Sequence, residues 1–528
     1  MIDINNAQAK SLIIAQTGKT TITAGNSLTV TEAINVTNNV ANDNLVVESD
    51  ANLLQINPIS NVGNMLAKRG VHMRKTDYTY WSSPVTGQKL LNTSGDGFSV
   101  GTPNNSILYY NEPTDRFKAV PATEINFVNA KGYAIRGKDS YLVTDPTNTP
   151  VPDELKFTGI PNNGNYSVTV QKSPDSGPVT APVEHGYNLI GNPYPSNIDF
   201  VKFFYLGNNS NVINAKAWFW SNVTPTVTQQ GSSYNGNNYA TITLAGGTPP
   251  TTTVTASTNT GAYVPTKNIK VGQAFIIQAK NLGMNQTLNY DNSIRTNEAG
   301  VFFNGKGNSQ INRYWMTLTT PAGIVNTILI GHMEGATNNY DPNYDADILT
   351  VGDDSFYSKL NTQKLQIQAR NPLDTEDVIP VGLKYAAAGT YKISVSVKEG
   401  IFASDQKIFL VDKLVNTYTD LSVQDYVFTA VKGTEDTRFE IVYKNKEVLE
   451  TGDLQKSEFV VYRDGENVVI KSSNILGKIE MYDASGRLVG ARSATKKELQ
   501  WNISTLPSGI YIIKAENSGN VRTKKIIK

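Results

Sequence analysis

The stretch Tyr391-Lys392-Ile393-Ser394-Val395-Ser396-Val397 decides the class of fold, because it alternates apolar and polar residues with period two. Successive side chains of a β-strand point to opposite faces of the sheet, so this pattern predicts a strand buried on one face. The runs Trp315–Thr319, Ile328–Ile330 and Phe439–Tyr443 are short, apolar and separated by turn residues. Short strands of this kind are typical of an antiparallel β-sandwich, which we expect over residues 298–445.

The N-terminal residues carry short β-branched runs at nearly regular intervals, with Gly and Asn between them. The runs are Leu12–Ile14, Thr20–Thr23, Leu28–Val30, Ile34–Val36 and Asn44–Val47. A strand this short cannot bury its own apolar face and must stack on the next one. We therefore expect a short β-helix-like ladder over residues 1–75. A stacked, flat sheet that caps the following residues is the alternative.

The rest of the chain is also predicted to be β-structure, because no segment shows the apolar stripe of an amphipathic helix. Residues 76–297 alternate strands with aromatic residues and polar loops, which indicates a β-rich surface module. Within it, Gly246–Gly261 is nearly all Thr, Pro, Gly, Ser and Ala, so we expect an exposed loop or an edge strand there. The charged segment Lys444–Lys456 predicts a linker over residues 446–457. Residues 458–528 then read as a small antiparallel β-sandwich, and the whole fold is all-β.

Composition excludes several classes of protein. The chain has 528 residues, more than the ~250–300 at which a single core stops growing, so several domains are expected. Lys plus Arg (47) almost cancel Asp plus Glu (46), which argues against nucleic acid as a partner. There is no cysteine, and no run of about 18 apolar residues predicts a transmembrane segment. No secretory leader is visible in Met1–Leu28, so an exported chain would be numbered from after a removed leader or be a fragment of a longer one.

The C-terminal segment contains four motifs in a fixed order. They are Val468–Lys471, Ile479–Asp483 leading into Ser485–Val489, Leu506–Tyr511 and the ending Lys524–Lys528. In this order and spacing they resemble the type A sorting domain of the Bacteroidetes type IX secretion system. The resemblance implies export through the periplasm and outer membrane to the cell surface or the medium. Its implied partners are the type IX translocon and the outer-membrane shuttle barrel.

The resemblance also implies which residues form the sorting signal. They are Gly486, Arg487, Leu488, Gly509, Tyr511, Lys524, Lys525 and Lys528. The basic tail Lys524–Lys528 is expected to be part of what the secretion machinery reads.

A second, looser resemblance covers most of residues 76–443. The segments that carry it are Tyr80–Val85, Gly186–Ser196, Gln229–Tyr234, Gly335–Asp347 and Arg438–Tyr443. They are similar to modules of long surface proteins of gliding flavobacteria. This likeness implies surface display, adhesion or gliding motility, and no catalytic chemistry.

Candidate catalytic residues are sparse. The three histidines, His72, His185 and His332, lie in different local contexts and no Gly-x-Ser-x-Gly elbow accompanies them, so we expect them on the surface or in loops. The aromatic stretches Tyr78–Trp81 and Trp218–Trp220 could stack on sugar rings, but such residues are more often the core of a sandwich.

The sharpest chemical candidate is the loop Asp341-Pro342-Asn343-Tyr344-Asp345-Ala346-Asp347. Oxygen ligands at alternate positions can converge on calcium, so Asp341, Asn343, Asp345 and Asp347 form a calcium candidate. The loop departs from the EF-hand pattern, because Ala346 stands where that pattern has glycine. A solvated acidic loop whose side chains cap turns is the alternative, and no other cofactor is expected.

Two classes of function fit these observations. The preferred one is a secreted cell-surface protein, adhesive or ligand-binding, with a surface glycan as one candidate ligand and no catalytic residue. The alternative is a secreted hydrolase that acts on polysaccharide or protein. The absence of a local catalytic signature favours the first.

Overall fold

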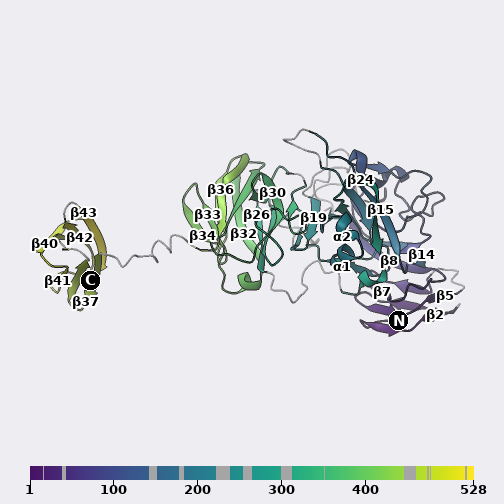
Figure 1. The fold of residues 1–528 in the computed structure, drawn as a ribbon, viewed down its shortest axis with the longest axis horizontal. Helices are drawn as coiled ribbons and strands as arrows, with labels where there is room; N and C mark the ends of the chain where they lie inside the picture. The colour runs from purple at the N-terminus through teal and green to yellow at the C-terminus, as the bar shows by residue number, and fades with distance from the viewer. Residues whose placement is uncertain are drawn as a thin grey trace. The chain divides into compact units, whose positions relative to one another are not determined.

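The computed structural model confirms the all-β prediction, with 52% of the chain in strands and 5% in helices. It describes all residues except 16, 38–42, 142–150, 178–183, 222–237, 254–263, 299–311, 350, 445–458, 473–474, 476 and 518–519. The chain divides into two compact units, Met1–Lys444 and Asn445–Lys528 (Figure 1). No helix in the described part of the chain is long and apolar enough to cross a membrane. The finer boundaries expected within residues 1–445 stay a prediction, and the expected linker 446–457 lies outside the described residues.

The first unit begins with a short parallel β-helix of three stacked rungs, in agreement with the ladder expected at the N-terminus (Figure 1). The rungs are β1 (Ala7–Ala9), β2 (Leu12–Ile14) and β3 (Thr20–Ile22); β4 (Ser27–Val30), β5 (Ile34–Val36) and β6 (Leu45–Val47); and β7 (Asn52–Gln55) with the start of β8 (Met65–Met73). Parallel register places Ile22 beside Val47 and Val47 beside Ala67, and all three side chains are buried. Each rung thus covers the apolar residues of its neighbour, which a rung alone could not do.

Strand β8 connects the β-helix to the structure that follows it. Its beginning pairs in parallel with β6, and its whole length pairs antiparallel with β14 (Val151–Pro161). Strand β10 (Val85–Thr86) then pairs with β14, so one sheet has the order β10-β14-β8-β6-β3. The apolar core runs without a break from the β-helix to Trp81, Phe98 and Phe157.

Two antiparallel sheets pack against each other in the middle of the first unit. One has the order β12-β11-β13-β9 and the other β16-β23-β18-β19-β20. Their strands are β9 (Tyr78–Trp81), β11 (Ile107–Asn111), β12 (Arg116–Ala119), β13 (Tyr133–Arg136), β16 (Tyr187–Gly191), β18 (Ala217–Trp220), β19 (Tyr239–Thr243), β20 (Gly246–Thr248) and β23 (Ala274–Gln278). Tyr80, Trp218 and Tyr239 are buried between them, so these aromatic residues belong to the core.

Smaller elements complete this region. They are β15 (Tyr166–Lys172) with β24 (Gly283–Tyr290), β17 (Asn197–Asp199) with β22 (Asn268–Ile269) and β25 (Arg295–Thr296), and the helices α1 (Phe200–Tyr205) and α2 (Asn209–Val212). Asp199 caps α1, because its carboxylate accepts hydrogen bonds from the backbone N–H groups of Val201 and Lys202. Phe203 of α1 packs on Phe275 of β23, which fixes the helix on the sheet.

Arg295 ties the β-helix to this middle region. Its side chain is 5% exposed, and its guanidinium donates to the Leu53 carbonyl oxygen at 2.6 Å and to Ser196 Oγ at 3.0 Å. It also donates to the side-chain oxygens of Asn163 and Asn292. These acceptors are neutral, and burial lowers the pKa of Arg295 to about 10, so the group is still charged at neutral pH. One buried cation therefore holds four separate chain segments together.

The last part of the first unit is the expected β-sandwich. Its sheet follows the path β34-β33-β36-β31-β29-β30-β27-β26-β32-β35, with β21 (Thr252–Thr253) and β28 (Ala346–Asp347) attached. The strands are β26 (Asn312–Thr319), β27 (Ile324–His332), β29 (Ser355–Leu360), β30 (Gln363–Arg370), β31 (Val378–Tyr385), β32 (Gly389–Glu399), β33 (Phe409–Asp412), β34 (Thr417–Asp420), β35 (Tyr426–Ala430) and β36 (Gly433–Val442). Tyr391 and Ile393 of β32 are buried and Lys392 between them is not, as the period-two pattern predicts.

The Gly246–Gly261 segment differs in part from the prediction. Its start is an edge strand, β20, as one of the two expectations had it, but Thr248 and Thr251 are buried and not exposed. The indole N–H of Trp315 donates to the Gly247 carbonyl oxygen at 2.7 Å, so the sandwich covers this edge. A Cβ at Gly247 would lie 2.3 Å from the Pro265 carbonyl oxygen, and only glycine permits this approach. Residues 254–261 lie outside the described residues.

The second unit is a small antiparallel sandwich, as expected for the C-terminal residues. Its sheets have the orders β37-β38-β41 and β40-β39-β42-β43. The strands are β37 (Phe459–Asp464), β38 (Asn467–Ser472), β39 (Gly477–Asp483), β40 (Leu488–Ala494), β41 (Glu498–Asn502), β42 (Ile510–Asn517) and β43 (Asn520–Ile527). Val468, Ile479 and Trp501 lie in the core between them.

The Arg295 contacts predict a large effect of a small substitution. Arg295→Lys keeps the charge but replaces the forked donors with one ammonium group, so several buried acceptors lose their donor. We expect the free energy of unfolding of the first unit to fall by about 2–4 kcal/mol in urea denaturation. The matched control is Arg116→Lys on the exposed strand β12, where a change within about 0.5 kcal/mol is expected. Equal stabilities of the two variants would contradict the role given to Arg295.

Candidate functional site

A polar groove of about 470 Å³ lies beside β14 on the first unit. Its lining residues are Gly87, Gln88, Lys89, Asp96, Gly97, Phe98, Val100, Lys138, Glu154, Leu155, Lys156 and Thr158. Three lysines and two carboxylates face it, which leaves one excess positive charge. A groove of this size and polarity can hold part of an extended, hydrophilic ligand.

Hydrogen bonds fix both walls of the groove. Gln88 Oε1 accepts from the Thr158 backbone N–H at 2.7 Å and so ties the loop after β10 to β14. On the other side, Asn92 Nδ2 donates to the carbonyl oxygens of Ser99 and Thr102. A Cβ at Gly97 would lie 2.3 Å from Asn92 Oδ1, so glycine is needed where the loop turns back. The walls are therefore preformed and do not need a ligand to order them.

The charged side chains of the groove differ in how they are paired. Lys89 bonds to Asp96, and this hydrogen bond holds the pKa of Asp96 at about 2. Lys138 bonds to Asp153 at 2.6 Å, outside the groove lining. Lys156 is exposed and has no ion-pair partner among the residues that the structure describes. Lys156 is therefore the groove cation best placed to take an anionic ligand group.

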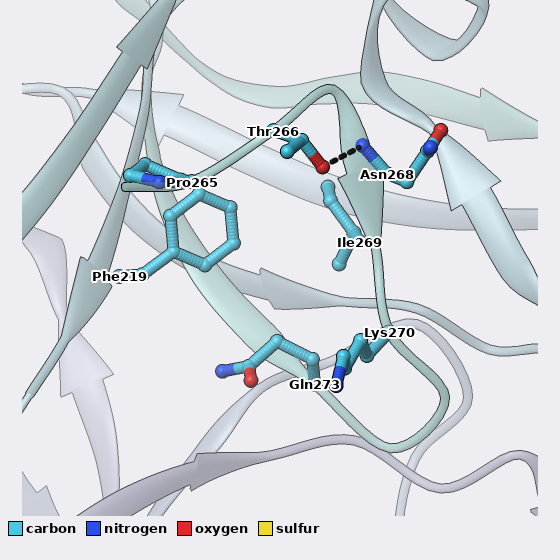
Figure 2. A pocket seen from close by; sticks show the side chains of 7 residues that line it. All are labelled: Phe219, Pro265, Thr266, Asn268, Ile269, Lys270 and Gln273. Carbon is cyan, nitrogen blue, oxygen red and sulfur yellow. Dashed lines mark hydrogen bonds between the residues drawn. The ribbon is translucent and has the colours of Figure 1, made fainter. Parts of the chain in front are cut away.

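A second pocket lies between β18 and the segment before β23. Figure 2 shows the Phe219 ring beside Pro265 on one side of the pocket, with Lys270 and Gln273 at the opposite end from Thr266. The Thr266 hydroxyl oxygen accepts from the Asn268 backbone N–H at 3.2 Å and closes the turn (Figure 2). The free volume of this pocket is about 10 Å³, which is room for no more than one water molecule. This pocket is too small for a sugar or a peptide side chain.

The Asp341–Asp347 loop packs at the contact between the sandwich and the β18–β20 strands. Asn343 Oδ1 accepts from the Ala215 backbone N–H at 3.1 Å, and the Asn343 carbonyl oxygen accepts from the Leu244 N–H at 3.1 Å. Asp345 is fully buried, and its two carboxylate oxygens accept from the backbone N–H groups of Asp341 and Ala369. Burial raises the pKa of Asp345 to about 7.

One oxygen each of Asp341 and Asp347 is also engaged. Asp341 Oδ2 accepts from the Thr337 N–H, and Asp347 Oδ2 accepts from the Tyr340 hydroxyl. The buried Lys216 ammonium donates to the Tyr340 oxygen at 2.6 Å and lies 3.8 Å from Asp347. Within the described residues, no group of three or more His, Cys, Asp or Glu is arranged to hold a metal ion. Calcium binding by Asp341, Asn343, Asp345 and Asp347 stays a prediction. The structure shows instead that hydrogen bonds from this loop hold neighbouring segments together.

His332 is buried within a strand, which corrects the expectation that the histidines lie on the surface or in loops, whereas His185 lies in the loop before β16, as expected, and is buried there. His185 is 7% exposed and its backbone N–H donates to Asp175. His332 of β27 is fully buried, with Nδ1 at 3.1 Å from the Asn371 carbonyl oxygen and Nε2 at 2.6 Å from the Tyr443 hydroxyl. Of His72 the structure describes only the backbone, within β8. The sequence signal for this burial is the alternation along β27, because His332 follows Ile328 and Ile330 at every second position and so shares their inner face.

The His332 hydrogen bonds form a chain in which each hydroxyl and the ring N–H donates once. The Tyr314 hydroxyl donates to Tyr443, the Tyr443 hydroxyl donates to His332 Nε2, and His332 Nδ1–H donates to the backbone. This assignment requires a neutral ring, and burial lowers the pKa of His332 to about 4. The nearest charges are those of Arg370 and Asp377, which pair with each other at 2.7 Å. The chain links β26, β27 and Tyr443, the residue after β36, inside the sandwich core.

The expected sorting-signal residues lie at turns and on β40, β42 and β43 of the second unit. Gly486 has φ +81° in the turn between β39 and β40, next to Arg487 and Leu488. Asp483 closes this turn by accepting from Ser485 and Arg487, and these bonds lower the pKa of Asp483 to about 2. Hydrogen bonds to the Asp483 carboxylate therefore stabilise this exposed turn.

The C-terminal end of the chain closes on the same unit. Gly509 and Lys528 exchange backbone hydrogen bonds of 3.2 and 2.9 Å, and Lys528 Nζ donates to the Ser504 carbonyl oxygen at 2.7 Å. The Tyr511 hydroxyl donates to the Pro507 carbonyl oxygen, whereas the side chains of Lys524 and Lys525 on β43 are exposed. The structure brings Gly509, Tyr511 and Lys528 together and leaves Lys524 and Lys525 open to a partner. Their role as a sorting signal stays a prediction.

Each of the two units matches the profile of a known family. A family profile described as a domain of unknown function (DUF8693) matches residues 1–443. The chain belongs to this family. A second profile, described as a secretion system C-terminal sorting domain, matches residues 464–528. It confirms the resemblance of the C-terminal segment to type IX sorting domains and supports export by that system.

No curated protein matches the chain. A solved structure described as "Biofilm associated protein - BSP domain" is 10% identical and spans 86% of this chain and 87% of its own, with a TM-score of 0.11. At that TM-score we draw nothing from the likeness. The similarity of residues 76–443 to modules of gliding flavobacteria stays a prediction.

The buried ring of His332 predicts a specific pH dependence. Its pKa of about 4 lies below the ordinary value of about 6.5, so the folded state disfavours the protonated ring. This contribution to stability is complete above about pH 6.5 and is lost as the pH falls toward 4, by about 3 kcal/mol in total. His332→Gln should therefore be less stable than the parent at pH 7, with the difference shrinking by about 2–3 kcal/mol at pH 4. Urea denaturation at both pH values tests this, and a difference independent of pH would contradict a neutral buried ring.

Proposed function

We propose that this protein is a cell-surface adhesin that binds a glycan bearing acidic groups through the groove beside β14. The observation that carries the proposal is the preformed groove with its excess of lysine. An exported protein meets polysaccharides outside the cell, and an open, polar groove suits a sugar chain better than a small molecule. Acidic sugars would add charge attraction to Lys156 and to the partly paired Lys89 and Lys138.

Export supports this role. The sorting domain implies that the protein meets the type IX secretion machinery and reaches the cell surface or the medium. In the proposal, the second unit contacts the translocon and the outer-membrane shuttle barrel, and the first unit binds the ligand. Gliding motility would be one use of such a surface adhesin.

The alternative, a secreted hydrolase, finds less support in the groove. A glycosidase needs one carboxyl group with a raised pKa to protonate the leaving oxygen. The groove carboxylates are Asp96, whose pKa Lys89 holds at about 2, and Glu154, which lies 3.5 Å from Lys68. The ion pair with Lys89 favours the ionised form of Asp96, which suits ligand binding and not proton donation.

The proposal predicts a charge-dependent loss of binding. Lys156→Glu should weaken binding of an acidic polysaccharide about tenfold, or about 1.4 kcal/mol, because it turns an attraction into a repulsion. The effect should shrink as salt is added, since the site is exposed. Binding is measured on an array that holds acidic and neutral glycans, followed by titration of the best ligands.

The matched control is Lys118→Glu on β12, an exposed lysine that does not line the groove. It should bind as the parent does. Equal effects of the two substitutions, or hydrolysis of the glycan by the parent protein, would contradict the proposal.

A further inference from the structure

Strand β35 lies at one end of the sandwich sheet and has one free edge. It pairs with β32 through five residues, from Ile393 opposite Tyr426 to Gly389 opposite Ala430. Among the described residues no strand pairs with its other edge. A free edge presents unpaired backbone N–H and C=O groups that another strand can bind.

Nothing in β35 blocks such pairing. Its sequence, Tyr-Val-Phe-Thr-Ala, contains no charged residue and no proline. The edge strand β12 shows the contrast, because it carries Arg116 and Lys118, which discourage the approach of another strand. The outward side chains of β35 and of the residue after it are apolar or small, with Val427 58% and Val431 74% exposed. This edge is therefore both unpaired and unprotected.

We infer that β35 pairs with β35 of a second copy of this chain. A two-fold axis perpendicular to the sheet makes the two strands antiparallel and keeps their inner faces on the same side. Residues directly opposite each other must then share a face, so outward residues meet outward ones. With Thr429 opposite Thr429 of the second copy, Val427 lies opposite Val431 in both directions. The exposed valines of each copy thus cover those of the other.

The inner face fits the same register. Phe428, which is buried in the sandwich core, would lie opposite Ala430 of the second copy, so a large side chain meets a small one. A groove of about 500 Å³ opens at the end of β35, between Thr429–Glu435 and Arg438. The start of the second copy's strand would run past this groove. Self-complementarity of side chains on both faces favours a second copy over an unrelated strand.

Pairing would also place two ligand-binding units on one particle. Two grooves on a rigid pair bind a repeating polymer more tightly than one, because the second contact is intramolecular. This consequence depends on the proposed function, whereas the pairing itself does not. The tests below measure assembly without any glycan, so failure of either proposal can be distinguished.

Sedimentation velocity of the full chain over a range of concentrations tests the pairing. The parent should show a concentration-dependent dimer, and Val427→Lys should be monomeric because two new cations would meet the apolar row. The matched control is Val423→Lys, which alters a residue that is 77% exposed and precedes β35, and it should dimerise as the parent does. Circular dichroism checks that both variants keep the β-fold. A parent that is monomeric at all concentrations, or a Val427→Lys dimer, would overturn the inference.

The register can be tested by cross-linking, since the chain contains no cysteine. Thr429→Cys should form a disulfide-linked dimer on mild oxidation, because the two residues 429 face each other across the axis. Val423→Cys should not, although its thiol is equally accessible. If both variants stay monomeric after oxidation, the register with Thr429 opposite Thr429 is wrong. The pairing of Val427 with Val431 is then wrong as well.

Discussion

The fold of the first unit depends on the pairing of β8 with two strands of opposite direction. At its start β8 completes the third rung of the β-helix by pairing with β6, and along its length it pairs with β14. The groove is built on β14, so the ladder of short rungs supports the wall of the candidate site. Arg295 makes the second connection, because it bonds to β7 of the β-helix and to two other segments of the middle region, at Ser196 and Asn163. The two connections hold the β-helix in place without disulfides, which the cysteine-free sequence cannot form.

Much of the fold could be predicted from the sequence, because it follows from local patterns. The period-two run of β32, the regular β-branched runs of the β-helix and the turns of the sorting domain each report the structure of their own segment. The groove could not be predicted in this way. Lys89 follows β10 and Lys156 lies on β14, so the pairing of these strands brings them together, whereas Lys138, after β13, reaches the groove beside its ion-pair partner Asp153. No local sequence pattern distinguishes any of them from another surface lysine.

The Asp341–Asp347 loop and the histidines show a second limit of sequence reasoning. Alternating oxygen ligands are typical of a calcium loop and equally of a loop that bonds to neighbouring segments. Here the oxygens of Asn343 and Asp345 accept from backbone N–H groups that are distant in the sequence. For the same reason His332 was expected at the surface. Its partners Asn371 and Tyr443 are distant in the sequence, and burial is only clear once β27 lies in the sandwich.

The central claim is that the chain combines a ligand-binding unit with a separate export unit. The hydrogen bonds of the second unit, including those between Gly509 and Lys528, close within that unit, so it should fold without the rest. The most direct measurement is to fuse residues 445–528 to a periplasmic reporter in a host with a type IX system, beside the same fusion without residues 524–528. The account predicts that the complete fusion brings the reporter outside the outer membrane and that the shortened one leaves it in the periplasm. A complete fusion that is folded and stays in the periplasm would contradict the account.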